Sequence, residues 1–200
     1  MKRISFFMVV FLTMVTSAYS QKIKVTSGSL DFLNSVDAFN VEYVYDPAMV
    51  VGKMTEQDYI EKKVSEYNAK EAGRGDKWLV SWVADRENRF QPKFKELFNK
   101  YAAEKNAPVI DTASNKEYKL IVNTYFTEPG FNVGVMRKNA AISIKAKFVN
   151  SNNEEVATMT IINASANNFW GTDFDSGYRL QETYAVAGRE LAKFLYKKWK

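Results

Sequence analysis

Apolar and polar residues alternate along three stretches of the chain, 39–45, 120–126 and 142–148. A period of two is typical of strands that bury one face against a core and leave the other in water. In the second stretch the alternation predicts that Leu120 and Phe126 share the buried face. The third stretch shows the pattern most clearly, because its apolar residues alternate strictly with Ser and Lys.

A polar turn at 150–153 follows the third stretch, and a further apolar segment at 156–162 predicts the second strand of a hairpin. Together with 120–126, these strands form a three-stranded antiparallel meander. The stretch 39–45 is expected to add an N-terminal strand to the same sheet. The segment 21–34 is polar and irregular, with room for a short edge strand.

A period of three to four residues predicts helices elsewhere in the chain. Thr55 is expected to cap a first helix that ends at Gly73, and Asp76 to cap a second. Pro92 should begin a third helix, because proline suits the first turn of a helix but disrupts its interior. The segment 180–194 predicts an amphipathic C-terminal helix.

This order of elements predicts an α+β fold, a two-layer sandwich of an antiparallel sheet with helices packed on one face. The sheet would consist of the three-stranded meander and the N-terminal strand. Neither an internal repeat nor a long linker divides the chain, so residues 21–200 are expected to form a single domain.

Residues 1–20 are predicted to be a cleavable signal peptide. Two basic residues precede an apolar run over 4–15, and small residues follow before a cut between Ser20 and Gln21. The run is shorter than the roughly 20 apolar residues that a membrane-spanning helix needs. The mature chain is therefore expected to be exported, periplasmic or extracellular, and not an integral membrane protein.

The composition excludes several classes of site. The chain contains neither Cys nor His, so disulfides, thiolate nucleophiles, Ser-His-Asp triads and zinc sites with Cys or His ligands are ruled out. Export without cysteine suits a bacterial envelope better than animal secretion. Removal of residues 1–20 leaves 26 basic and 23 acidic residues, a mild and dispersed excess that does not indicate a nucleic-acid partner.

Two Gly-rich loops, 128–136 and 167–177, are the candidate functional segments. Their aromatic residues Phe131, Trp170 and Phe174 are candidates for a binding surface, since loops on a rigid scaffold commonly carry function. The alternative is that these rings simply fill the edge of the sandwich, as most large aromatic residues are buried.

The carboxylates in the same loops allow two further interpretations. Glu128 and Asp173 form a possible acid and base pair for a hydrolase, provided that they lie within about 10 Å of each other. Asp173, Asp175 and Glu182 have the spacing of EF-hand calcium ligands, but Gly171 occupies the first ligand position. Acidic residues ahead of a helix also serve as caps, which is the simpler explanation.

Three segments, Gly75–Trp78, Tyr125–Phe131 and Asp173–Arg179, resemble a group of uncharacterised exported proteins of Bacteroidetes. The resemblance implies export and a single domain, and it implies no activity. Asp111-Thr112-Ala113 is similar to the O-glycosylation sequon of exported Bacteroidetes proteins, so Thr112 is a candidate glycosylation site.

The leading functional hypothesis is a non-catalytic envelope module that binds a protein or glycan through the two loops, without a cofactor. The chain shows no specific catalytic motif, which argues against an enzyme. A carboxylate-dependent hydrolase and a purely structural subunit of an envelope complex are the alternatives.

Overall fold

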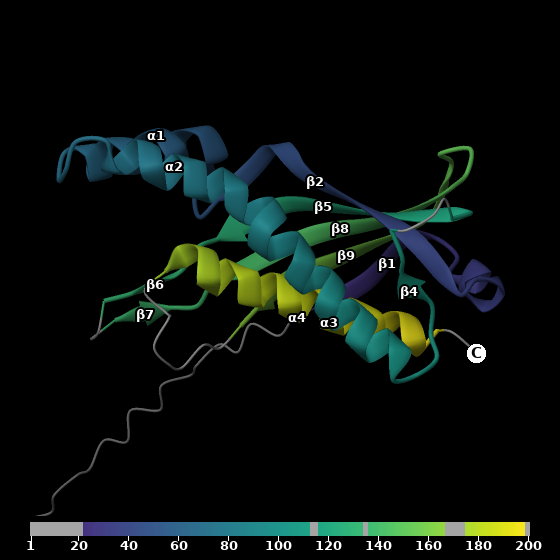
Figure 1. The fold of residues 1–200 in the computed structure, drawn as a ribbon. Helices are drawn as coiled ribbons and strands as arrows, with labels where there is room; N and C mark the ends of the chain where they lie inside the picture. Colours follow the sequence, from purple (N-terminus) through teal and green to yellow (C-terminus); the bar gives the residue numbers. More distant parts are fainter. Residues whose placement is uncertain (1–21, 113–115, 134–135, 167–174, 199–200) are drawn as a thin grey trace, which may run out of the picture.

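The computed structural model describes residues 22–112, 116–133, 136–166 and 175–198, which form a mixed α+β fold (Figure 1). The strands are β1 (Lys22–Gly28), β2 (Ala38–Val51), β3 (Met54–Thr55), β4 (Val109–Ile110), β5 (Tyr118–Glu128), β6 (Phe131–Asn132), β7 (Arg137–Lys138), β8 (Ala141–Asn150) and β9 (Glu155–Ser165). The helices are α1 (Glu56–Asn68), α2 (Arg74–Asp85), α3 (Gln91–Ala103) and α4 (Ser176–Tyr196), with a 3-10 turn η1 (Asp31–Ser35) and a π-helical turn η2 (Arg86–Phe90).

The sheet is larger than the sequence predicted and is not purely antiparallel. Seven strands pair in the order β1-β9-β8-β5-β2-β3, with β4 beside β2. The meander of β5, β8 and β9 is present, with the β6–β7 hairpin inserted between its first two strands. However, β2 runs parallel to β5, because α1, α2 and α3 lie between them and return the chain to the same end of the sheet. The polar segment 21–34, where the sequence left room for a short edge strand, contains β1, which lies at the edge of the sheet and pairs with β9 along its length.

A bulge in β5 overturns the expected position of Phe126. The pairing with β8 shifts between Thr124 and Phe126, so that Phe126 lies opposite Ser143 and Thr127 lies opposite Ile142. Because a bulge inserts one residue into a strand, every later side chain changes face. Thr127 is therefore the buried residue, at 4% exposure, and Phe126 points to the other face of the sheet.

The second and third predicted helices form one continuous rod. The chain passes from α2 through η2 into α3 without leaving a helical conformation, and Figure 1 shows the three segments as one long bent rod. Pro92 lies in the first turn of α3, as predicted. The π-helical turn explains how the rod tolerates it, since a wider turn relieves the clash between a proline ring and the preceding turn.

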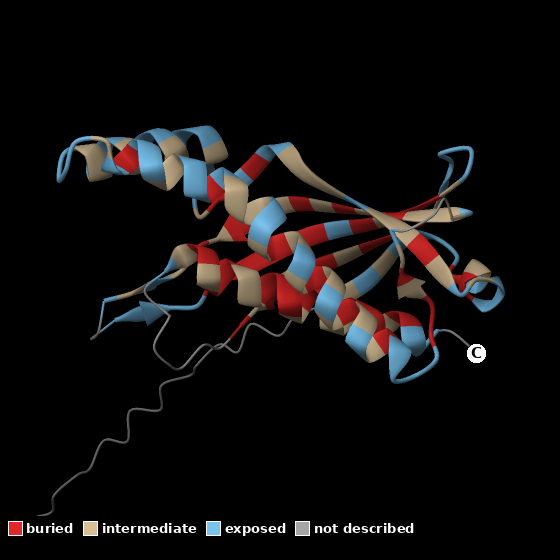
Figure 2. Cartoon of the chain, in the orientation of Figure 1, coloured by how far each residue is buried: buried red, intermediate tan, exposed pale blue. Residues whose placement is uncertain are grey.

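The core lies between the sheet and the α3–α4 pair, which covers one sheet face (Figures 1 and 2). Phe39 and Phe148 from the sheet meet in an edge-to-face contact with centroids 4.9 Å apart, and Phe98 of α3 packs on Phe39. The two helices approach closely at Gly188, where a Cβ atom would lie 2.2 Å from the Phe94 carbonyl oxygen. Within the described ranges, no helix has both the length and the apolar character needed to cross a membrane.

Candidate functional site

The two Gly-rich loops leave the sheet at the same end. Glu128 at the end of β5 pairs with Ala141 at the start of β8, which in turn pairs with Ser165 at the end of β9. The Ser165 hydroxyl also donates a hydrogen bond of 2.8 Å to the Ala140 carbonyl oxygen. The strand register therefore brings the bases of both loops together, although they are far apart in the sequence.

The first turns of α4 join the two loops directly. Arg179 is buried, and its Nε donates to the Pro129 carbonyl oxygen at 3.0 Å while its NH2 group donates to the Gly130 carbonyl oxygen at 3.1 Å. The second loop ends at Asp175, one helical turn before Arg179. Arg179 therefore links the described part of the first loop to the helix at which the second loop ends.

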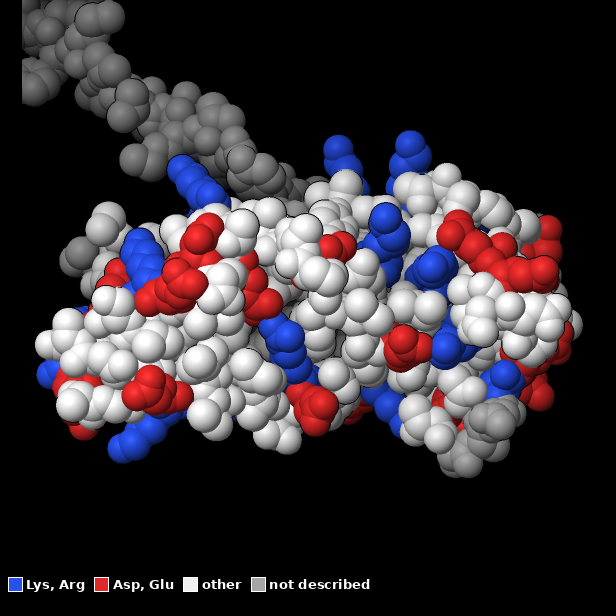
Figure 3. Space-filling view, turned by 90° about the horizontal axis from the view of Figure 1, so that it is seen from above, with Lys and Arg blue, Asp and Glu red and all other residues white. Residues whose placement is uncertain are grey.

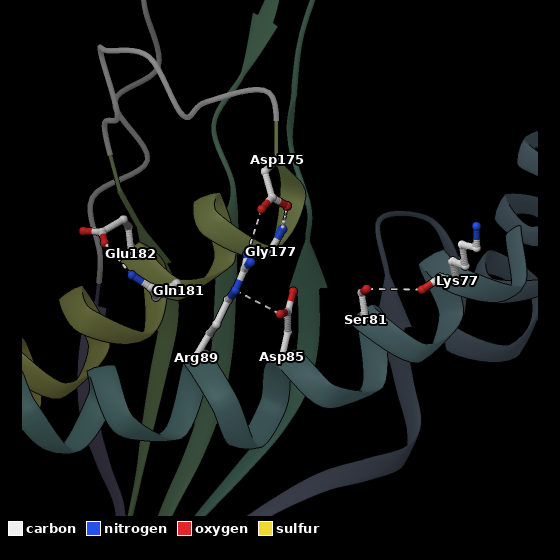
Figure 4. Close-up of polar contacts among 8 residues, drawn as sticks. All are labelled: Lys77, Ser81, Asp85, Arg89, Asp175, Gly177, Gln181 and Glu182. Atoms are coloured by element: carbon white, nitrogen blue, oxygen red, sulfur yellow. Dashed lines mark hydrogen bonds and ion pairs between the residues drawn. The ribbon is translucent and has the colours of Figure 1, made fainter. Parts of the chain in front are cut away.

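Asp175 begins α4 as the predicted cap. One carboxylate oxygen accepts a hydrogen bond of 2.8 Å from the Gly177 backbone N–H, and the other accepts one of 2.7 Å from Arg89 of η2 (Figure 4). Glu182 lies further along the helix and accepts from its neighbour Gln181. The described residues contain no group of three acidic side chains that could hold a metal ion. Asp173 lies outside the described residues, so the calcium interpretation stays a prediction.

Arg89 lies between two carboxylates. Its Nε is 3.1 Å from Asp85 Oδ1 on the preceding turn of the rod, and its other end contacts Asp175 (Figure 4). A Cβ atom at Gly177 would lie 2.0 Å from Asp85 Oδ2. The absence of a side chain at Gly177 therefore allows the start of α4 to rest against the rod.

The pKa values of the two carboxylates are shifted in opposite directions. Burial raises the pKa of Asp85, and the Asp175 charge adds to this rise while Arg89 opposes it. Burial alone would raise the pKa of Asp175 as well. Hydrogen bonds from Arg89 and Gly177 outweigh the effect of burial and hold this pKa below its usual range. Asp175 is therefore the stronger acid of the pair, since it has both an ion pair and a helix N-terminus.

A groove of about 470 Å³ runs beside this ion-pair cluster. Its lining combines cations, carboxylates, a hydroxyl, an amide and an indole, from Lys77, Trp78, Ser81, Ala84, Asp85, Asn88, Arg89 and Asp175. Four of these residues recur at every fourth position of the rod, from Lys77 to Arg89, and so form a polar stripe (Figure 4). The sequence itself shows this four-residue spacing, which predicts a polar face on the helix. It was missed because only the apolar stripe of the same helix was followed.

Trp78 forms the aromatic wall of the groove, and neighbouring aromatic rings hold it in place. Trp78 stacks on Trp82 with centroids 5.5 Å apart, and Tyr59 of α1 packs against both rings. The Trp82 indole N–H donates to Glu56 Oε1 at 2.8 Å, and Arg86 contacts the same oxygen at 2.5 Å. These contacts tie the α1–α2 hairpin to η2 and hold Trp78 in place.

In the described ranges, the remaining predicted site residues do not line this groove. Glu128 accepts from the Gly130 backbone N–H at 3.0 Å and pairs with Lys138 across the β6–β7 hairpin, so it orders its own loop. Phe131 is 41% exposed and does not fill the sandwich edge. Thr112 is exposed and accepts a hydrogen bond of 3.0 Å from Lys95. The predicted residues that lie outside the described ranges are Ser20, Gln21, Trp170, Asp173 and Phe174.

No family model and no curated protein matches the chain. Among solved structures, a PelC dodecamer from Paraburkholderia phytofirmans is similar with 12% identity, covering 84% of this chain and 96% of that chain at a TM-score of 0.35. A DUF330 protein from Xanthomonas campestris shares 11% identity over 80% and 85% of the two chains, at a TM-score of 0.31. A putative neuraminyllactose-binding hemagglutinin homolog from Helicobacter pylori shares 8% identity over 84% of this chain and 86% of that chain, at a TM-score of 0.29. Likeness at these TM-scores carries no conclusion about function.

Proposed function

We propose that the protein is a non-catalytic binding module of a bacterial envelope, and that the groove beside Arg89 holds its ligand. The observation that carries this proposal is the polar stripe from Lys77 to Arg89, which lines a groove at the end of the sheet where both loops meet. The volume of about 470 Å³ lies within the range of small-ligand sites.

The arrangement of charges favours binding over proton transfer. Arg89 forms ion pairs with both Asp85 and Asp175, and these contacts hold all three side chains in one orientation. Preorganised donors and acceptors bind a polar ligand with little further loss of side-chain entropy. Glu128 lies in a separate ion pair with Lys138, and Asp173, its possible catalytic partner, lies outside the described residues.

The ligand proposed for the groove is a glycan. Sugar hydroxyls both donate and accept hydrogen bonds, and the lining offers carboxylate acceptors, cationic donors and the Asn88 amide, which can do both. The wall formed by Trp78 provides an apolar surface for the carbon-bound face of a sugar ring. A peptide segment is the competing occupant, and it is an outcome of the test below.

The test compares Lys77→Ala/Asn88→Ala with the wild-type protein by titration calorimetry against soluble peptidoglycan fragments and neutral envelope oligosaccharides. These two side chains line the groove and lie outside the Asp85–Arg89–Asp175 ion pairs, so the fold should be retained. We expect about tenfold weaker binding, equivalent to two lost hydrogen bonds of about 0.7 kcal/mol each.

Lys70→Ala/Glu71→Ala is the matched control, because both residues are exposed in the α1–α2 turn and neither lines the groove. The control should bind like the wild type. Equal affinity of the groove variant and the wild type would contradict the proposed site. Binding of envelope peptides in place of every glycan tested would identify a protein-binding module instead.

A carboxylate-dependent hydrolase is the second candidate, and one observation favours it. The pKa values of Asp85 and Asp175 are shifted apart within one groove, which is how acid and base roles are divided in many enzymes. If the protein is a hydrolase, envelope glycans should release reducing ends on incubation with it, and Asp85→Asn should abolish the release. No release by the wild-type protein would exclude this candidate for those substrates.

We also propose that the chain is exported after cleavage between Ser20 and Gln21, and that it belongs to the exported Bacteroidetes group that its motifs resemble. Expression of the full chain in a bacterium, followed by mass measurement of the periplasmic product, tests the export step. The expected mass is that of residues 21–200. A product that stays in the cytoplasm and still carries residues 1–20 would contradict export.

A further inference from the structure

The outer face of the sheet, opposite α3 and α4, carries a regular array of lysines. On β8, Lys145 is exposed while its neighbours Ile144 and Ala146 are fully buried against the helices. Lys147 lies two residues further on the same face. Lys22 and Lys24 are exposed in the same alternating pattern on the edge strand β1.

The strand register aligns these lysines in two directions. Lys24 pairs with Thr160 of β9, and Thr160 pairs with Lys145 of β8, so one row crosses three strands. Neighbouring strands lie about 4.8 Å apart, which places the Cα atoms of Lys24 and Lys145 about 10 Å from each other. Lys145 and Lys147 are separated by about 7 Å along their strand. Thr158, which pairs with Lys147, is buried, so Thr160 is the hydroxyl that lies between the lysine-bearing strands.

The positive charges on this half of the sheet are only partly balanced. In the described part of the chain, none of these four lysines forms an ion pair. The other half differs, since Lys119 of β5 pairs with Glu42 of β2 at 2.8 Å. Elsewhere, on the face seen in Figure 3, basic and acidic side chains are interspersed. The Glu155 carboxylate at the edge of the array accepts a hydrogen bond from the Ser27 hydroxyl, and this bond together with the charges of Lys147 and Lys145 lowers the pKa of Glu155.

We propose that the outer face of β1, β9 and β8 binds an anionic polysaccharide along the array of Lys22, Lys24, Lys145 and Lys147. A polymer with a carboxylate on each sugar or disaccharide unit presents charges at the spacing of the array. The Thr160 side chain lies between Lys24 and Lys145, and its hydroxyl suits a sugar hydroxyl. This surface is separate from the groove, and the inference stands or falls independently of the proposed glycan in that site.

An anionic membrane is the less suitable partner for this face. Peripheral membrane binding needs apolar side chains that enter the lipid as well as basic residues. Of the large apolar residues that are strongly exposed in the described structure, only Ile162 lies on β1, β8 or β9, at 48% exposure. A polar and basic face therefore favours a hydrated polymer.

The experiment measures binding of the wild-type protein and of Lys145→Gln/Lys147→Gln to immobilised polygalacturonate, with neutral dextran and anionic phospholipid vesicles as comparison probes. Lys53→Gln/Lys70→Gln is the matched control, because it removes two exposed positive charges away from the sheet face. The face variant should bind polygalacturonate about tenfold more weakly, and the control should change affinity less than twofold. Wild-type binding should weaken steeply with added salt, since exposed charges are screened.

Three outcomes would overturn the proposal. Equal losses in the face variant and the control would show that only net charge matters. Wild-type binding to vesicles without binding to polygalacturonate would identify a lipid surface as the partner. Equal affinity of the wild type for dextran and polygalacturonate would show that the lysines do not select an anionic polymer. Lys145→Arg/Lys147→Arg should retain binding, which separates loss of charge from loss of fold.

Discussion

The two helix pairs of this molecule are built on different principles. The α3–α4 pair lies on the sheet, and its inner faces consist of fully buried residues such as Phe94, Phe98 and Leu191. The α1–α2 pair projects beyond the sheet, and α1 has no buried residue at all (Figures 1 and 2). The comparison indicates that one pair supplies stability, while the other supplies an exposed polar surface that rests on a few aromatic and ionic contacts.

The largest expected effect comes from emptying the core of the stable pair. Phe98→Ala should lower the free energy of unfolding by about 3–5 kcal/mol, because it leaves a cavity against Phe39 that the packed helices cannot close. Trp78→Ala in the projecting pair should cost only about 1–2 kcal/mol, since its ring is half-buried. Urea denaturation followed by circular dichroism measures both. A larger loss for Trp78→Ala would reverse the assigned roles.

Two glycines sharpen the comparison, because they are equally crowded. A Cβ atom at Gly188 would lie 2.2 Å from Phe94 O, between α3 and α4, and one at Gly75 would lie 2.3 Å from Val64 O, between α1 and α2. Gly188→Ala should destabilise by about 2–3 kcal/mol, because α3 cannot move without disturbing the core. Gly75→Ala should cost about 1 kcal/mol, since the projecting helices can separate slightly. Thermal melts of both variants test this, and equal losses would contradict it.

The smallest effect concerns the ion pair that joins the rod to α4. Asp175 has a lowered pKa in the folded protein, so its charge stabilises the fold above about pH 4. This contribution is lost as the pH falls through the lowered pKa. The side chain is 53% exposed, so the contribution is at most about 1 kcal/mol.

Asp175→Asn isolates that contribution, because Asn caps a helix about as well as Asp but carries no charge. The free energy of unfolding of the variant should lie below that of the wild type at pH 7, and the difference should shrink toward pH 2. Urea titrations at a series of pH values measure it. A difference that grows on acidification would show that Arg89 does not stabilise this carboxylate.

The sequence predicted those elements whose periodicity reflects local burial. Strand β8 and the helix α4 were recognised because their apolar residues face one core along their whole length. The parallel pairing of β2 with β5 was not predictable, because alternation of side chains says nothing about strand direction. The bulge at Tyr125 was missed for a similar reason, since it is a property of the pairing with β8.

The candidate site was predictable only in part. The loops were recognised from their glycines and aromatic residues, and Asp175 was correctly assigned as a helix cap. The contribution of the rod was missed, because Asp85 and Arg89 reach α4 only through tertiary contacts with Asp175 and Gly177. Sequence patterns show which face of a helix is polar, but they do not show what lies opposite it.

The π-helical turn η2 acts as a phase correction in the long rod. Trp82 lies before this turn and Phe98 after it, and both side chains are buried. In an uninterrupted α-helix, their separation of 16 residues would rotate the two side chains about 160° apart, to nearly opposite sides. The wide turn at Arg86–Phe90 absorbs part of that rotation. Deleting a single residue from this turn would rotate α3 by about 100° relative to α2. One rod can therefore present a buried edge to the sheet and an open edge to a ligand only while that extra residue is retained.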